Sequence, residues 1–194
     1  MQFDNSFDVP LPPAEAWALL MDIPRIAPCM PGAELTEIID AQNYKGKIAV
    51  RLGPVALAFA GRVTFENVDT ANRTARVKAQ GSDARGRGGA NAAATFRIEP
   101  AGAGSKVLIH TELALSGAVA QYGRGAGMIE ATASQIIGQF AGNLHAQLAQ
   151  QSAKTATAPA APPPPAKPIA GLSLLFRVIW SKLAALFDGS GGRL

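Results

Sequence analysis

The sequence predicts an α+β fold in which an antiparallel sheet wraps on a long C-terminal helix. Apolar and polar residues alternate repeatedly between positions 55 and 115, and a helical repeat of apolar residues follows over 127–151. Period-two alternation is typical of antiparallel strands that have one face in water. A third observation is the abrupt change of composition after this helix, which predicts a proline-rich linker over 152–168, an amphipathic helix over 169–188 and a tail over 189–194.

Length and composition limit the class of protein. A chain of 194 residues allows one domain of ordinary size, here expected over 1–151, with a remainder. Hydrophobic residues make up 48% and charged residues 16%, which excludes a disordered chain and a multi-span membrane protein. The single cysteine, Cys29, excludes an intramolecular disulfide, and with only two histidines we expect no metal centre. Residues 1–10 lack a basic start and an apolar run, so we expect no secretory signal and a cytoplasmic location.

The positive charge is confined to the end of the chain. The net charge is +4, and acidic and basic residues balance over 1–150. The excess lies in the last 44 residues, 151–194, where five basic residues accompany one acid, Asp188. A neutral body gives no electrostatic reason to bind nucleic acid, whereas a basic tail favours an anionic membrane surface.

The first 32 residues predict a strand, a short helix and an irregular stretch. Residues 2–9 read as a strand, and Pro12-Pro13 opens a short helix that continues to Met21, because proline is tolerated in a first helical turn. Three prolines and a glycine then predict an irregular stretch over 22–32.

The middle of the chain predicts strands joined by turns. Strands are expected over 55–65, 74–80 and 107–115, where apolar and polar residues alternate. Turn residues occur at 40–43, 53–54, 69–72 and 100–105. The RGRGG run at 85–89 reads as a glycine-rich hairpin or bulge, rather than as a segment that binds nucleic acid. The final helix of the domain carries a set of apolar residues at helical spacing: Ile129, Ala133, Ile136, Ile137, Phe140, Leu144 and Leu148.

The face of the sheet that is expected to point inward carries many small residues. These are Gly46, Gly61, Ala75, Ala79, Gly81, Ala92 and Ala94. Because packed interiors avoid voids, such residues either admit the long helix closely or leave room for a ligand, and the sequence leaves both possibilities open. No charged residue is expected on this face, so any ligand should be largely apolar.

The segment after the linker has the pattern of a helix that lies in a membrane interface. Its apolar residues share one helical face: Leu172, Leu175, Phe176, Ile179, Trp180, Leu183, Leu186 and Phe187. Arg177 and Lys182 would each cost about 3 kcal/mol at the centre of a bilayer, but an interfacial helix lets both reach the headgroups. Docking on the protein's own core would need only a short connection, so the long linker argues against it, and docking on a partner protein remains as the alternative.

Three stretches resemble the CoxG family of carbon monoxide dehydrogenase subunits, within the START-like, helix-grip superfamily (SRPBCC). They are DIPRIAPCMPGAE at 22–34, YKGKIAVRLGPVALAFAGRV at 44–63 and SGAVAQYGRGAGMIEATA at 116–133. The linker and the terminal amphipathic helix also look like those of longer family members. The resemblance implies a ligand-cavity domain of the helix-grip fold over 1–151.

The resemblance also implies a function. Family members accompany carbon monoxide dehydrogenases, which contain molybdenum, iron–sulfur clusters and flavin, and related hydroxylases. They are implicated in bringing the dehydrogenase to the membrane and in handling quinone. We therefore expect a non-catalytic protein without a covalent cofactor, attached peripherally to the inner face of the cell membrane, that binds menaquinone, ubiquinone or another apolar molecule.

Candidate residues for the cavity are apolar, aromatic or sulfur-containing, because such side chains suit a flat ring and an isoprenoid chain. They are Trp17, Met21, Cys29, Met30, Phe59, Phe96, Tyr122, Met128, Ile136 and Phe140. Gly123, Gly125 and Gly127, before the long helix, are either turn residues or a gate to the cavity.

Two alternatives remain. One is a recruitment or assembly factor that transfers no ligand, and the other is an enzyme resembling helix-grip cyclases and hydrolases. The residues favour the enzyme less. His110 and Glu112 share the strand face opposite the apolar one, His145 is expected on the outer side of the last helix, and Cys29 has no histidine near it in sequence to act as a base.

Overall fold

The computed structural model describes residues 1–124 and 126–157 of the chain, and the side chains of residues 1–121 and 127–151. The chain divides into two compact units, Met1–Thr155 and Ala156–Leu194. The expected amphipathic helix over 169–188, with its membrane-facing residues, and the tail over 189–194 lie outside the described residues.

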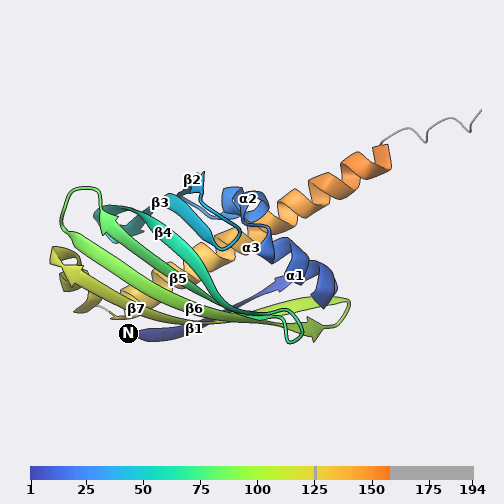
Figure 1. Cartoon of the computed structure of the whole chain (residues 1–194), viewed down its shortest axis with the longest axis horizontal. Helices are drawn as coiled ribbons and strands as arrows, with labels where there is room; N and C mark the ends of the chain where they lie inside the picture. Colours follow the sequence, from blue (N-terminus) through green and yellow to red (C-terminus); the bar gives the residue numbers. More distant parts are fainter. Residues whose placement is uncertain (125, 158–194) are drawn as a thin grey trace, which may run out of the picture. The chain divides into compact units, whose positions relative to one another are not determined.

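Seven antiparallel strands form one sheet in the order β1-β7-β6-β5-β4-β3-β2 (Figure 1). The strands are β1 (Gln2–Val9), β2 (Ala33–Ile38), β3 (Asn43–Leu52), β4 (Val55–Asp69), β5 (Thr74–Asp83), β6 (Gly88–Ala101) and β7 (Gly104–Gly117). Between β1 and β2 lie α1 (Pro13–Met21), α2 (Ile23–Ile26) and the 3-10 turn η1 (Ala27–Cys29). After β7 come η2 (Ala118–Arg124) and the long helix α3 (Ala126–Thr157). The predicted α+β architecture is confirmed.

The elements that the sequence does not delimit are those with weak patterns. The irregular stretch holds α2 and η1, and β6 begins with glycine and alanine, GGANAAA, which have little β propensity. The RGRGG run forms the turn between β5 and β6, as expected of a hairpin. At the end of β5, Asp83 is buried and accepts hydrogen bonds from Arg87 of this turn, from Nε at 2.8 Å and from Nη2 at 2.9 Å. The Arg87 guanidinium holds the pKa of the Asp83 carboxyl well below its usual range.

Helix α3 continues past the boundary that the sequence predicts at Gln151. It ends at Thr157, so the first residues of the expected linker, 152–157, are helical. These residues contain alanine and lysine, which favour helix, and no proline.

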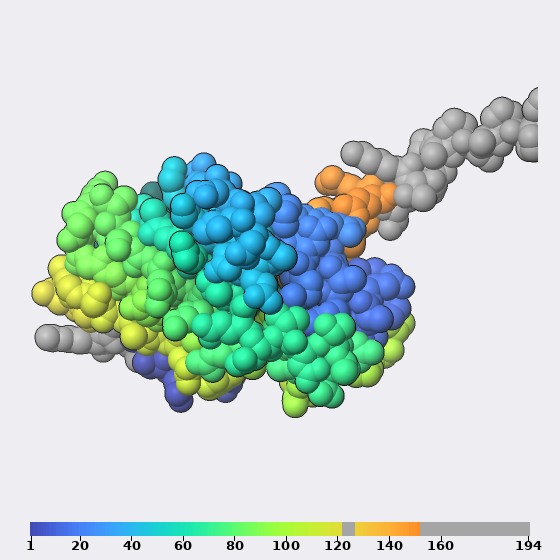
Figure 2. Space-filling model, in the orientation of Figure 1, coloured from blue at the N-terminus to red at the C-terminus, as the bar shows by residue number. Residues whose placement is uncertain are grey.

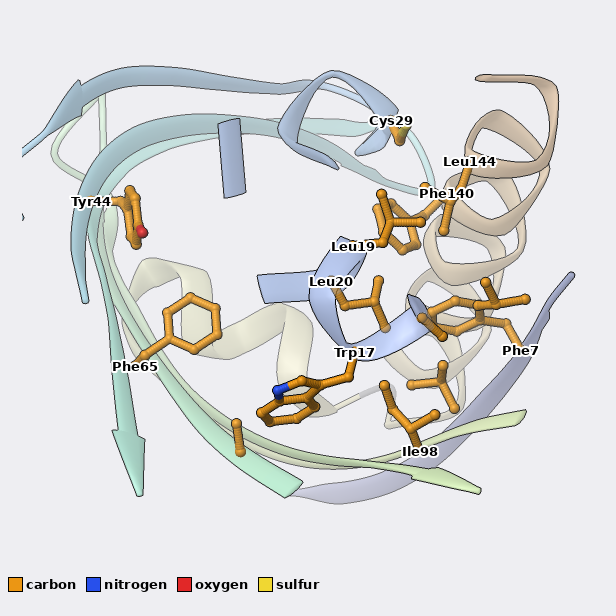
Figure 3. Close-up of a cluster of buried hydrophobic side chains, with 14 residues drawn as sticks. Phe7, Trp17, Leu19, Leu20, Cys29, Tyr44, Phe65, Ile98, Phe140 and Leu144 are labelled. Carbon is orange, nitrogen blue, oxygen red and sulfur yellow. The ribbon is translucent and has the colours of Figure 1, made fainter. Parts of the chain in front are cut away.

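The core lies between the sheet, α1 and α3 (Figure 3). Phe7 of β1 contacts Phe140 of α3 edge to face, with ring centroids 5.5 Å apart, and Trp17 of α1 contacts Phe96 of β6 at 5.8 Å. Helix α1 buries Ala16, Trp17, Leu19 and Leu20. In Figure 3 the side chains of Trp17, Leu19 and Leu20 stand between Phe140 and Leu144 on one side and Tyr44 and Phe65 on the other. A second cluster packs Leu52, Leu57, Val119 and Ile129.

A row of glycines crosses three neighbouring strands. Gly46 of β3 pairs with Gly61 of β4, which pairs with Gly81 of β5. A Cβ atom on Gly61 would collide with the Gln80 carbonyl oxygen, and one on Gly46 would lie 2.8 Å from the Glu34 carbonyl oxygen. Glycine is needed because the backbones approach so closely, which is typical of a sharp bend in a sheet. We call this row the glycine crease.

Candidate functional site

A cavity of about 440 Å³ lies over the glycine crease. Its wall comes from β2 to β6 of the sheet, from α2 and η1, and from one residue of α3, Phe140. The apolar residues of the wall are Ile23, Ile26, Ala27, Met30, Ala33, Leu35, Tyr44, Ile48, Phe59, Val63, Ala79, Ala90, Ala92 and Phe140. In Figure 2 the dark blue segment that contains α1 lies beside the lighter blue segment that contains β2, on the face turned to the viewer.

The cavity exists because small residues replace large ones on this part of the sheet. Of the small residues that the sequence places on the inner face, Gly46, Gly61, Ala79, Gly81 and Ala92 line the cavity. Ala75 is instead fully buried in the core, and Ala94 does not line the cavity. The crease adds no side chain to this space, and the alanines beside it add only a methyl group each. The small residues therefore leave room, which decides between the two possibilities that the sequence leaves open.

The wall presents no free polar side chain from its apolar residues. The one hydroxyl among its apolar residues, on Tyr44, donates to the Ala41 carbonyl oxygen at 2.8 Å. Burial raises the pKa of Tyr44, so the phenol stays protonated and keeps this bond. Polar residues also border the cavity, at Glu34, Lys45, Lys47, Arg62 and Gln80, but all five are exposed. These five side chains alternate with inward-facing ones and lie on the outer face of the sheet, so the interior of the cavity stays apolar.

The segment of α2 and η1 covers part of the cavity and is fastened to α3 by polar contacts. Asn143 Nδ2 donates to the Cys29 carbonyl oxygen at 2.9 Å, and Gln147 Nε2 donates to the Arg25 carbonyl oxygen at 3.3 Å. Arg25 Nη2 donates to Gln151 Oε1 at 2.6 Å. These three α3 residues are four apart, so they lie on one face of the helix. No residue of α2 is buried.

Cys29 takes part in the same set of contacts. Its thiol is buried and donates to Gln147 Oε1 at 2.7 Å. Burial raises the pKa of the Cys29 thiol, so the group stays protonated and acts as a hydrogen-bond donor. This environment is opposite to that of a reactive cysteine, whose pKa is lowered by nearby positive charge.

The structure brings some of the predicted cavity residues together on the wall and places others around it. Met30, Phe59 and Phe140 line the cavity. Trp17, Met21, Cys29 and Phe96 belong to the adjoining core. Ile136 is partly buried on α3 but does not line the cavity. Met128 is 50% exposed and lies near Gly53, in the turn between β3 and β4.

The predicted gate falls largely outside the described side chains. Gly123 of the predicted gate and Tyr122, a predicted cavity residue, lie in η2, where only the backbone is described, and Gly125 lies outside the described residues. Gly127 lies in the first turn of α3, and a Cβ atom there would meet nothing within 4 Å. The space around Gly127 therefore does not require a glycine.

Six larger wall residues were not predicted from the sequence: Ile23, Ile26, Leu35, Tyr44, Ile48 and Val63. Ile23 and Ile26 lie in the proline-rich stretch, where no periodic pattern reveals which side chains point inward. Tyr44, Ile48 and Val63 lie on β3 and β4 at the same alternate positions as the crease glycines, and this spacing could have identified them.

The candidate catalytic residues do not face the cavity. His110 Nδ1 lies 2.7 Å from Asp4 Oδ1, and Glu112 accepts from Arg76 Nη2 at 3.0 Å; both contacts lie away from the cavity wall. His145 is exposed, with Nε2 2.8 Å from the Asp8 carbonyl oxygen. Within the part of the chain that the structure describes, no three His, Cys, Asp or Glu side chains are grouped to hold a metal ion. Among the same residues, no helix has the length and apolar character needed to cross a membrane.

A single antiparallel sheet packed on a long C-terminal helix, with an apolar cavity beside the helix, is the helix-grip fold. The model of the CoxG family of carbon monoxide dehydrogenase subunits matches residues 6–149, and the chain belongs to this family. Membership associates the chain with carbon monoxide dehydrogenase in an accessory role.

Solved structures support the fold. A conserved protein from Geobacillus kaustophilus has a TM-score of 0.67 at 18% identity, over 78% of this chain and 97% of that protein. A Thermus thermophilus protein has a TM-score of 0.56 at 13% identity, over 76% and 99%. The ZhuI aromatase/cyclase from Streptomyces has a TM-score of 0.55 at 13% identity, over 78% and 95%. No curated protein matches the chain.

Proposed function

We propose that this protein is an accessory component that tethers a molybdenum-containing carbon monoxide dehydrogenase, or a related hydroxylase, to the cytoplasmic membrane and binds a respiratory quinone in its cavity. The observation that carries the proposal is the apolar cavity of about 440 Å³ over the glycine crease. Pockets that bind small molecules have volumes of about 300–1,000 Å³ and mostly apolar walls.

The proposal connects two places that differ in polarity. Oxidation of carbon monoxide releases electrons inside a water-soluble enzyme, whereas a respiratory quinone is dissolved in lipid. A protein with an apolar cavity can hold such a molecule away from the bilayer without exposing its hydrocarbon to water, which would cost about 0.8 kcal/mol per CH₂ group. The ligand is menaquinone, ubiquinone or another apolar molecule of similar kind.

The membrane part of the proposal rests on the sequence of the terminal segment. The apolar face from Leu172 to Phe187, with Arg177 and Lys182, has the pattern of an interfacial helix. Each basic residue adds about 1 kcal/mol of attraction near an anionic surface, so attachment should be reversible. On this proposal the protein works at the inner face of the cytoplasmic membrane.

We further propose that the chain binds rather than catalyses. General acid–base catalysis needs an ionisable group within reach of the bound molecule. On the described part of the wall the inward side chains are apolar, and the Tyr44 hydroxyl is already hydrogen-bonded. A binding role without a covalent cofactor fits such a wall.

Native mass spectrometry of the full chain, extracted gently from the membranes of its host, tests the ligand. We expect a bound species with the mass of a quinone. Ala92 lines the cavity, so Ala92→Leu should abolish this species, whereas Ala60→Leu, on the exposed face of the same sheet, should retain it. A ligand-free mass for the wild-type protein would favour the recruitment factor that transfers no ligand.

Flotation with anionic liposomes tests the tether. The full chain should float, and a chain that ends at Thr157, where α3 ends, should stay at the bottom of the gradient. Equal flotation of the two would exclude the terminal segment as the anchor.

A further inference from the structure

The part of the cavity wall that strands β3 to β6 form offers no free hydrogen-bond donor to a guest. Strands β3, β4, β5 and β6 pair in continuous antiparallel ladders through the cavity region, so their N–H groups are engaged with neighbouring strands. Among the described residues, no buried side-chain nitrogen or oxygen lacks a hydrogen-bond partner. Strands β3 to β6 and the buried side chains of the described wall therefore have no unused polar group that awaits a ligand.

The two parts of a quinone differ in what they need from a binding site. The ring carries two carbonyl oxygens, which accept hydrogen bonds from water and lose them when they are buried without donors. The prenyl chain carries no polar atom and loses only unfavourable contact with water. A donor-free cavity therefore favours the chain over the ring.

The border of the cavity differs from its interior. Lys47, Arg62 and Gln80 border the cavity only along the backbone, because their exposed side chains alternate with the inward-facing crease glycines and point to the other face of the sheet. The cavity is partly open to solvent, so water is available at its border as a hydrogen-bond donor. A ring at this border keeps hydrogen bonds to its carbonyl oxygens while the attached chain lies inside.

We propose that the cavity binds the prenyl chain of its ligand and leaves the quinone ring at the border, outside the apolar interior. This inference rests on the proposed function and deepens it, because it names the part of the ligand that is recognised. The protein then selects for prenyl chains and does not distinguish ring types. A ring held at the border is reachable by a redox partner while the ligand stays bound.

Calorimetric titration of the delipidated full chain with four probes tests the inference. Menaquinone-2 and ubiquinone-2 have different rings and the same chain of two isoprene units; geraniol has that chain with no quinone ring; menadione has the ring of menaquinone with no chain. We expect the first three to bind with dissociation constants within about tenfold of one another. Menadione should bind at least about 100-fold more weakly, since it lacks the CH₂ and CH₃ groups that the cavity buries.

The outcomes separate the inference from the proposed function. Menadione binding as tightly as menaquinone-2, or failure of geraniol alone, would overturn the inference while leaving quinone binding intact. If none of the four probes binds, the proposed function fails and the inference fails with it.

A second measurement reports the position of the ring directly. Dithionite in water supplies two electrons, and water supplies two protons, to convert menaquinone-2 to its quinol. With the ring at the border, reduction of bound menaquinone-2 should proceed at a rate within about tenfold of that for menaquinone-2 in detergent micelles, a tenfold rate change being about 1.36 kcal/mol in barrier. Protection of the bound ring by a much larger factor would place the ring inside and contradict the inference. The Ala60→Leu variant serves as the matched control, and Ala92→Leu should lose binding of both menaquinone-2 and geraniol.

Discussion

The two halves of the space between the sheet and α3 are filled differently. In one half, Phe7, Trp17, Phe96 and Phe140 bring aromatic rings into contact, and Leu144 is fully buried among them. In the other half, the glycine crease and the alanines beside it line a cavity of about 440 Å³. The same sheet therefore supports a close-packed core and a hollow, and side-chain size at alternate strand positions decides which is formed.

Helix α1 and the segment of α2 and η1 also differ in how they are held in place. Helix α1 is held by four buried side chains, whereas α2 has none and its segment is fastened to α3 by hydrogen bonds from Asn143 and Gln147. Burial of apolar side chains stabilises an element more than a few partly exposed hydrogen bonds do. Stability should therefore be concentrated in the packed half, and ligand binding in the hollow half.

The largest expected effect on stability comes from removing the Trp17 ring in the packed half. Trp17→Ala removes a side chain that is 7% exposed and contacts Phe96. We expect the free energy of unfolding to fall by about 3–5 kcal/mol, measured by urea denaturation. In contrast, Ala92→Leu in the hollow half should change it by less than about 1.5 kcal/mol, because the cavity has room for the added atoms. Equal losses in the two variants would mean that the hollow half is packed as tightly as the core.

The ion pair of Asp83 and Arg87, next to the turn between β5 and β6, should make the stability of the fold depend on pH. The pKa of Asp83 is lowered by Arg87, so the pair stabilises the fold above the ordinary carboxyl pKa of about 3.9 and the stabilisation is lost as pH falls below it. Asp83→Asn should therefore lower the melting temperature at neutral pH. The difference from wild type should shrink as the pH is lowered from about 4 toward 2. A difference that stays constant over this range would exclude the ion pair as its cause.

Two Gly→Ala substitutions test whether the glycine crease needs glycine: one lies in the crease and the other lies in α3, where space is open. Gly61→Ala would drive Cβ into the Gln80 carbonyl oxygen, so we expect a loss of about 1–3 kcal/mol of stability. Gly127→Ala adds a methyl group that meets nothing within 4 Å in a helix, so it should stabilise by up to about 1 kcal/mol. Denaturation curves of the two variants provide the comparison. A stabilising Gly61→Ala would show that the crease does not depend on close backbone contact.

The smallest expected effect on stability comes from loosening the segment of α2 and η1, which covers part of the cavity. Gln147→Ala removes the acceptor of the Cys29 thiol and the donor to the Arg25 carbonyl oxygen. Global stability should fall by about 1 kcal/mol, while amide hydrogens of residues 23–30 should exchange faster than in wild type. Gln150→Ala, at an exposed position near the end of α3, is the control. Unchanged exchange over 23–30 would show that these contacts do not fasten the segment.

The sequence predicts the parts of the molecule in which periodicity is strong. The alternation in β4, β5 and β7 and the helical repeat of α3 identify those elements, and the small residues on alternate positions predict a place for a cavity. The wall contributed by Ile23 and Ile26 could not be predicted, because a four-residue helix between prolines has no period to read. Nor could the sequence separate Phe59, which lines the cavity, from Phe96, which packs against Trp17, since both lie on alternating strands and differ only in their neighbours in space.

The central claim is that the interior beside the glycine crease is hollow and apolar. Crystals of the protein under xenon pressure test it directly, because apolar cavities stay dry and bind xenon. We predict xenon density among Phe59, Ala92 and Phe140 in the wild-type protein, and its loss in Ala92→Leu. A wild-type interior filled by side chains or by ordered water at this place would contradict the account.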